Sequence, residues 1–125
     1  MNELTKEWVE KAEGDFNTVL REYRARKAPN YDAACFHAQQ CIEKYMKARL
    51  QDAGIPFGKT HDLIALLELC IQVEPLWEAF RTSLIIINRY AVDFRYPGES
   101  ATREEAKEAV YIMQGLRELM RKALG

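Results

Sequence analysis

Residues 35–48 read CFHAQQCIEKYMKA, and this stretch decides the fold class. Its apolar side chains recur at intervals of three and four residues, which is the spacing of one face of an α-helix. The same face extends back to Tyr31, and Asn30 is suited to cap the N-terminus of the helix. Gly54 is a natural terminator. The stretch therefore predicts a long amphipathic helix over residues 31–52.

The same periodicity recurs on both sides of this stretch. It predicts further long helices over residues 4–23, 75–96 and 103–123, and a shorter one over residues 61–71. Thr60 is expected to cap the shorter helix, and Thr102 with Glu105 matches a capping box. Pro97 and Gly98 are expected to stop the helix that begins at residue 75. Because no stretch alternates with a period of two, no strand is predicted.

A chain of 125 residues is long enough for one hydrophobic core and too short for two, so we expect a single domain over residues 1–125. Short connections between long amphipathic helices favour antiparallel neighbours. The predicted fold class is therefore all-α. It is an up-and-down antiparallel helical bundle of four long helices plus one shorter helix packed across them.

Composition and charge exclude several classes of protein. The formal net charge is −1, so the whole protein has no general attraction for nucleic acid or anionic lipid. No apolar run is long enough to span a bilayer, and the acidic first residues are unlike a secretion signal. We therefore expect a cytoplasmic protein that does not contact membranes. Any phosphate must be bound by a local group of residues.

No motif for a metal, a cofactor or a nucleophile is found, so no metal and no cofactor are expected. The three cysteines, Cys35, Cys41 and Cys70, lack metal-ligand spacing and are expected to be small buried apolar residues. Gly58-Lys-Thr is similar to the end of a phosphate loop, but Ala53 occupies the position of the first glycine and no strand precedes it.

The stretch INRYAVDFRYPGES, residues 87–100, concentrates polar and aromatic groups at the end of a predicted helix. On a helix, Arg89, Asp93 and Tyr96 would fall within about 60° of one another. A guanidinium, a carboxylate and a phenol on one stripe could bind a phosphate. The alternative is a simple Arg–Asp pair four residues apart, with Tyr96 packed at the helix end.

A second candidate lies on the predicted helix 31–52, where His37, Gln40 and Lys44 line up at three- and four-residue spacing. They could form a polar rim that contacts a ligand or a partner. The alternative is that His37, which has no acidic or histidine neighbour on its own face, is a solvated or hydrogen-bonded bystander. In that alternative Lys44 and Lys47 lie in solvent.

Three stretches in this order carry a family resemblance. They are HAQQCIEKYMKARLQDAGIPFGKTHDL (residues 37–63), NRYAVDFRYP (residues 88–97) and the last helix. Together they resemble the HEPN domain family (higher eukaryotes and prokaryotes nucleotide-binding). The resemblance implies a bundle of four to five helices that often forms antiparallel dimers. Many small prokaryotic members are encoded beside a minimal nucleotidyltransferase as toxin–antitoxin-like pairs, and some members are metal-independent ribonucleases.

The ribonuclease motif of that family is an arginine, four to six variable residues and a histidine, with a tyrosine two residues later in the toxin subgroup. By this resemblance the arginine corresponds to Arg89 and the tyrosine to Tyr96, while Phe94 stands at the position of the histidine. Phenylalanine cannot transfer a proton. His37 or His61 could supply an imidazole only if the fold, or a second subunit, brings it near Arg89.

The resemblance leads us to expect a homodimer that binds nucleotide or RNA phosphates where two subunits meet and acts with a nucleotidyltransferase. Arg89 would bind the phosphate, and Asp93 would orient Arg89. Tyr96 would orient the ligand by hydrogen bonding or accept modification by the nucleotidyltransferase. The alternatives are a metal-independent endoribonuclease, with Arg89 and Tyr96 as its catalytic candidates, and a structural bundle without a ligand site. The expected phosphate-binding residues are Arg89, Asp93, Arg95, Tyr96, His37 and Lys44.

Overall fold

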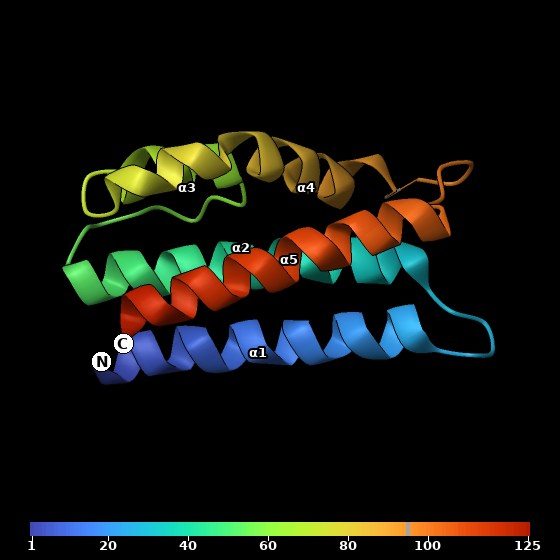
Figure 1. Cartoon of the computed structure of the whole chain (residues 1–125), viewed down its shortest axis with the longest axis horizontal. Coiled ribbons are helices and arrows are strands. Elements are labelled where there is room, and N and C mark those ends of the chain that lie inside the picture. The colour runs from blue at the N-terminus through green and yellow to red at the C-terminus, as the bar shows by residue number, and fades with distance from the viewer. Residues whose placement is uncertain (95) are drawn as a thin grey trace.

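The computed structural model describes residues 1–94 and 96–125, and all regular structure in these residues is helical (Figure 1). Its elements in chain order are α1 (Glu3–Arg24), α2 (Tyr31–Ala53), α3 (Leu63–Cys70), the 3₁₀-helix η1 (Pro75–Phe80), α4 (Arg81–Asp93) and α5 (Arg103–Leu124). Consecutive long helices run in opposite directions (Figure 1). The predicted all-α antiparallel bundle with one shorter helix is confirmed.

Helix α2 is the centre of the bundle, because it packs against α1, α3, α4 and α5. In Figure 1, α1 lies on one side of the α2–α5 pair, and α3 and α4 lie on the other. Small side chains along α2, including Ala34, Ala38 and Cys41, are fully buried and let neighbouring helices approach closely. Each large apolar side chain buried here contributes about 1.5–3 kcal/mol.

Local sequence sets the ends of most helices as predicted. Asn30 accepts a hydrogen bond from the Ala33 N–H, and Gly54 ends α2 in a left-handed conformation with φ of 72°. The capping box of Thr102 and Glu105 opens α5. The prediction that Thr60 caps the third helix is wrong. Asp62 is the N-cap instead, because the helix begins at Leu63.

The predicted helix 75–96 is divided and shortened. Its start is η1, in which the Trp77 N–H donates to the Glu74 carbonyl at 3.0 Å, and the α-helix begins only at Arg81. At its other end α4 stops at Asp93. Pro97 disfavours helical backbone at the residue before it, so the helix cannot continue through Tyr96.

The three cysteines are free and buried, as predicted. Burial raises the pKa of the Cys35 and Cys70 thiols to about 12 and raises that of Cys41 as well. Among the described residues, no helix combines the length and the apolar character that a membrane span requires. Every buried side-chain nitrogen or oxygen in residues 1–94 and 96–125 has a hydrogen-bond partner.

One ion cluster joins α1, α2 and α5. The Glu13 carboxylate accepts hydrogen bonds from Arg117 Nε at 2.7 Å and Nη2 at 2.6 Å, and another from the Tyr45 hydroxyl. The Tyr45 hydroxyl also accepts a hydrogen bond from Arg121 at 2.9 Å. The hydrogen bonds from Arg117 lower the pKa of Glu13 below its ordinary value of 4.5.

Replacing Glu13 by glutamine is expected to lower the free energy of unfolding by about 1–3 kcal/mol at neutral pH, because charge-assisted hydrogen bonds are lost. A lowered folded-state pKa means that this stability is present above the ordinary carboxyl pKa and is lost as the pH falls through the folded value. The difference between wild type and Glu13→Gln should therefore shrink below about pH 4.5. Urea unfolding followed by circular dichroism measures it.

The matched control is Glu10→Gln, on an exposed position of the same helix. It should unfold like the wild type at every pH. A Glu13→Gln difference that stays constant into the acid range would contradict the assigned role of the carboxylate.

Candidate functional site

A cleft of about 350 Å³ opens between α2, the start of α3 and α4. We call it the α2–α4 cleft. Aromatic, amide, imidazole and carboxylate groups line it together, so it offers both packing and hydrogen-bonding surfaces. Its lining residues are Phe36, Gln39, Gln40, His61, Asp62, Asn88 and Val92.

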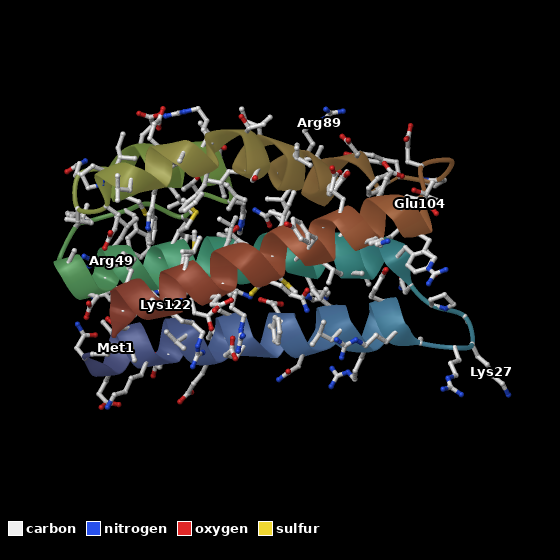
Figure 2. The ribbon with its side chains drawn as sticks, viewed as in Figure 1. Met1, Lys27, Arg49, Arg89, Glu104 and Lys122 are labelled. Atoms are coloured by element: carbon white, nitrogen blue, oxygen red, sulfur yellow. The ribbon has the colours of Figure 1, made fainter. Side chains whose placement is uncertain are left out.

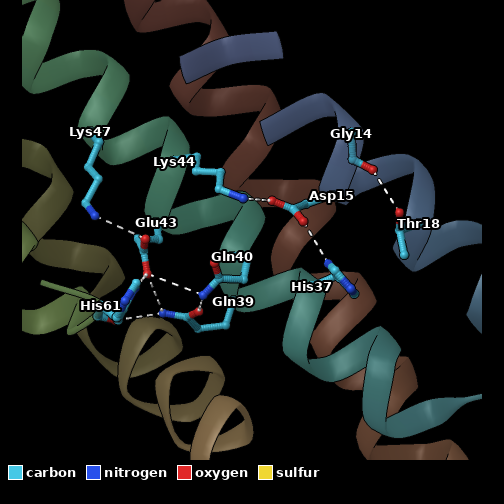
Figure 3. Close-up of polar contacts among 10 residues, drawn as sticks. All are labelled: Gly14, Asp15, Thr18, His37, Gln39, Gln40, Glu43, Lys44, Lys47 and His61. Atoms are coloured by element: carbon cyan, nitrogen blue, oxygen red, sulfur yellow. Dashed lines mark hydrogen bonds and ion pairs between the residues drawn. The ribbon is translucent and has the colours of Figure 1, made fainter. Parts of the chain in front are cut away.

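The chemical centre of the cleft is an imidazole held by a buried carboxylate (Figure 3). His61 Nδ1 lies 2.9 Å from Glu43 Oε1. The Glu43 side chain is 3% exposed, whereas that of His61 is 73% exposed. When Nδ1–H donates to the carboxylate, Nε2 is left with its lone pair available to the cleft. This arrangement suits a proton acceptor or, when protonated, an anion-binding group.

The buried charge of Glu43 is balanced within α2. Lys47 Nζ lies 3.1 Å from Glu43 Oε2, and both side chains are almost fully buried. The pair stabilises the carboxylate that would otherwise be costly to bury. Gln40 Nε2 lies 3.4 Å from Glu43 Oε1, so several polar groups converge on this carboxylate (Figure 3).

Hydrogen bonds hold the loop that carries His61 against α2 and α4. Gln39 Nε2 donates to the His61 carbonyl at 2.8 Å. From α4, Asn88 Oδ1 accepts the Leu63 N–H at 3.1 Å, and Asn88 Nδ2 donates to Asp62 Oδ1 at 3.1 Å. The position of His61 relative to α4 is therefore fixed by backbone and side-chain contacts together.

Arg89 follows Asn88 on α4 but is not one of the residues that line the cleft. Its side chain is 73% exposed, and Figure 2 shows it on the side of α4 that faces away from the bundle. The predicted pair with Asp93 exists, but Nε and Oδ2 are 3.9 Å apart, which is longer than a hydrogen bond. The guanidinium is therefore accessible to a ligand.

Tyr96 does not share the helical stripe predicted for it, because α4 ends at Asp93. It lies beyond the helix and is 67% exposed. Arg95 lies outside the described residues. Phe94, at the position of the family histidine, packs against the ring of Tyr90 with centroids 5.8 Å apart. Phe94 therefore has a packing role at the end of α4.

The three residues of the predicted polar rim, His37, Gln40 and Lys44, do not form one group in the structure. Gln40 enters the cleft, whereas His37 Nδ1 and Lys44 Nζ contact the two oxygens of Asp15 on α1, at 2.7 and 2.5 Å (Figure 3). His37 is hydrogen-bonded, as the second alternative allowed, whereas the expectation that Lys44 and Lys47 lie in solvent is wrong. The partner of His37 and Lys44 lies on another helix, which spacing along α2 does not reveal, whereas Lys47 pairs with Glu43 four residues before it on α2.

The cleft combines residues that the sequence reasoning singled out with several that it missed. His61 was considered only as a remote source of an imidazole, and Glu43, Gln39 and Asn88 were not considered as site residues. In the described part of the chain, no group of three or more histidine, cysteine, aspartate and glutamate side chains could hold a metal ion. The arrangement offers a carboxylate-held imidazole in the cleft and, next in sequence to the cleft residue Asn88, an exposed guanidinium; each of these groups can bind an anion.

Comparison with known proteins agrees with this architecture. The sequence model of the HEPN domain family matches residues 5–123. The crystal structure of TT1696 from Thermus thermophilus has a similar fold, with a TM-score of 0.79 and 21% sequence identity over 95% of this chain and 97% of that one. At this identity the likeness shows the fold alone. No curated protein matches the chain. Since the family match covers nearly the whole sequence, the chain belongs to the HEPN domain family.

Proposed function

We propose that this HEPN-domain chain is a homodimeric module that binds the phosphates of a nucleotide or RNA. In this proposal it acts with a separately encoded minimal nucleotidyltransferase in a toxin–antitoxin-like pair. The observation that carries the phosphate-binding part is the exposed Arg89 guanidinium, which has only a long contact with Asp93 at 3.9 Å. Its planar N–H groups match two phosphate oxygens. His61, when protonated, adds a second donor in the α2–α4 cleft.

The membership in the HEPN domain family supports the remaining parts of the proposal, namely the homodimer and the nucleotidyltransferase partner. A monomer offers one guanidinium and one imidazole against the carboxylates of Asp62 and Asp93, so a single cleft binds phosphate weakly. Two copies would present two such sites to one polyanion and so raise the avidity.

Calorimetric titration with ATP and with a short oligouridylate tests the phosphate site. Arg89→Ala should weaken binding of whichever ligand the wild type takes by about tenfold or more, since a charge-assisted contact contributes about 1.5–3 kcal/mol. The matched control is Arg24→Ala, an exposed arginine on α1, across the bundle from α4 (Figure 1). Wild type that binds neither ligand, or Arg89→Ala that binds as tightly as wild type, would overturn the phosphate site.

Tyr96 is the proposed acceptor for the partner enzyme because its phenol is exposed beyond the end of α4. In the transfer, the phenolic oxygen of Tyr96 bonds to the α-phosphorus of a nucleoside triphosphate. The bond to the bridging oxygen breaks, pyrophosphate leaves and the phenolic proton passes to a base.

Incubation with the co-encoded nucleotidyltransferase and ATP should add one adenylyl group to the wild type, read as a mass increase of the intact protein. Tyr96→Phe should remove the modification. The matched control is Tyr111→Phe, because Tyr111 is also an exposed tyrosine but lies on α5. Modification that persists in Tyr96→Phe would refute this acceptor.

A second candidate function, a metal-independent endoribonuclease, is favoured by the contact of His61 with Glu43 at 2.9 Å. His61 Nε2 would take the proton of a ribose 2′-hydroxyl. The 2′ oxygen would bond to phosphorus as the bond from phosphorus to the 5′ oxygen breaks and that oxygen gains a proton. Arg89 would neutralise the phosphate.

RNA incubated with the protein and a chelator should then yield ends with 2′,3′-cyclic phosphate. His61→Ala should slow cleavage by about 10²–10⁴-fold, the contribution of a general base. His37→Ala is the matched control, because His37 is bound to Asp15 on α1. Intact RNA at high protein concentration, or equal cleavage by His61→Ala, rules out this second function.

A further inference from the structure

A second pocket, of about 300 Å³, opens between the first turn of α2 and the last turn of α4. We call it the aromatic pocket, because the rings of Phe36, Tyr90 and Phe94 line it together with the imidazole of His37 and the carboxylate of Asp32. Among the described residues, its lining shares only Phe36 with the α2–α4 cleft. The aromatic pocket is therefore a separate site, and it takes no part in the proposed binding of phosphate.

The rings of the aromatic pocket come from both helices. Tyr90 and Phe94 stack on α4, with ring centroids 5.8 Å apart. On α2, Phe36 meets His37 edge to face, with centroids 5.2 Å apart. The hydroxyl of Tyr90 donates a hydrogen bond to Glu108 on α5, which holds its ring in place. Aromatic rings attract a cation through their π-faces, so this lining suits a positively charged ligand.

Two hydrogen-bond acceptors of the aromatic pocket are available to a ligand. Asp32 Oδ1 accepts the Ala101 N–H at 2.6 Å, whereas Oδ2 accepts no hydrogen bond from any described residue. His37 Nδ1 lies 2.7 Å from Asp15, whose charge is already paired with Lys44 (Figure 3). When the neutral imidazole donates Nδ1–H to Asp15, its Nε2 keeps a lone pair that can accept a hydrogen bond.

The charges around the aromatic pocket are negative. In the described part of the chain, its lining includes the carboxylate of Asp32 and no lysine or arginine. Burial, the hydrogen bond to Glu108 and the charge of Glu105 raise the pKa of Tyr90. Burial and the charges of Glu105 and Asp32 likewise raise the pKa of the Cys35 thiol to about 12. These electrostatics favour a cation in the pocket and disfavour a phosphate.

The two helix ends at the pocket agree with this preference. The C-terminal end of α4 carries a partial negative charge, which attracts a cation. The first turn of α2 carries a partial positive charge, but the carboxylate of Asp32 lies in that turn and offsets it.

We propose that the aromatic pocket binds a small primary alkylammonium ion. The rings of Phe36, Tyr90 and Phe94 contact its alkyl group and its charged nitrogen. The N–H groups of the ligand donate to Asp32 Oδ2 and to His37 Nε2. A volume of about 300 Å³ lies at the lower end of the range for small-molecule sites, so the ligand is a short amine.

Titration with butylammonium chloride, followed by proton–nitrogen correlation NMR of the wild type, tests this proposal. The shift changes should centre on the residues that line the aromatic pocket. Butan-1-ol, a neutral counterpart of similar size, should bind about fivefold or more weakly, because it lacks the charge that the rings and Asp32 attract. Sodium chloride at the same concentration controls for ionic strength.

Two variants locate the site. Asp32→Asn should raise the dissociation constant of butylammonium by about fivefold or more and leave that of butan-1-ol unchanged, because asparagine keeps an oxygen for the Ala101 N–H but has no charge. Phe94→Leu should weaken butylammonium binding by about threefold or more, since one ring is lost. The matched control is Asp52→Asn, an equal charge change at the other end of α2, which should bind like the wild type.

The proposal is overturned if butylammonium shifts no residue of the pocket, if butan-1-ol binds as tightly, or if folded Asp32→Asn binds like the wild type. The same spectra show whether each variant is folded, and Phe94→Leu decides the question if Asp32→Asn is not. Arg89→Ala, which tests the phosphate site, should leave butylammonium binding unchanged. The amine site and the phosphate site can therefore fail independently of each other.

Discussion

The structure depends on the packing of α2 against four other helices. A helix buried on several faces must bury some polar side chains, and each of these needs a partner. The sequence of α2 meets this requirement with Gln39, Glu43 and Lys47, all buried and all hydrogen-bonded. Glu43 has Lys47 as its ion-pair partner and directs its other oxygen toward His61. Glu43 is therefore a paired residue of the core and also the group that orients the imidazole of His61 in the cleft.

This coupling places the candidate site at the boundary between core and surface. Glu43 and Lys47 lie inside the bundle, and the exposed imidazole of His61, which lines the cleft, contacts Glu43. Arg89 lies further out on α4. Phe94 packs on Tyr90 at the end of α4 and supplies no imidazole. The imidazole of this cleft comes instead from the start of α3, brought to α4 by the hydrogen bonds of Asn88.

The fold followed closely from the sequence because helix periodicity and caps are local signals. The stripe on residues 31–52, Gly54, and the capping box of Thr102 all behave as local rules predict. The incorrect predictions concern the end of one helix and the side-chain contacts between different elements. α4 ends at Asp93, earlier than its apolar pattern suggested, and this removes Tyr96 from the stripe of Arg89. The contacts of His37 with Asp15 and of His61 with Glu43 join residues 22 and 18 positions apart, and spacing along one helix cannot reveal them.

The two contacts of Glu43, with Lys47 and with His61, restrict which substitutions the fold tolerates at this position. Removing one partner of a buried ion pair leaves the other charge uncompensated, at a cost of about 3–5 kcal/mol, which is a large part of the stability of a small domain. Exposed positions such as Arg89 and Tyr96 tolerate exchange within about 0.5 kcal/mol. The fold therefore tolerates single substitutions at these exposed positions better than a single substitution at Glu43 or Lys47. Stability thus limits change at the buried pair and leaves the exposed positions open to it.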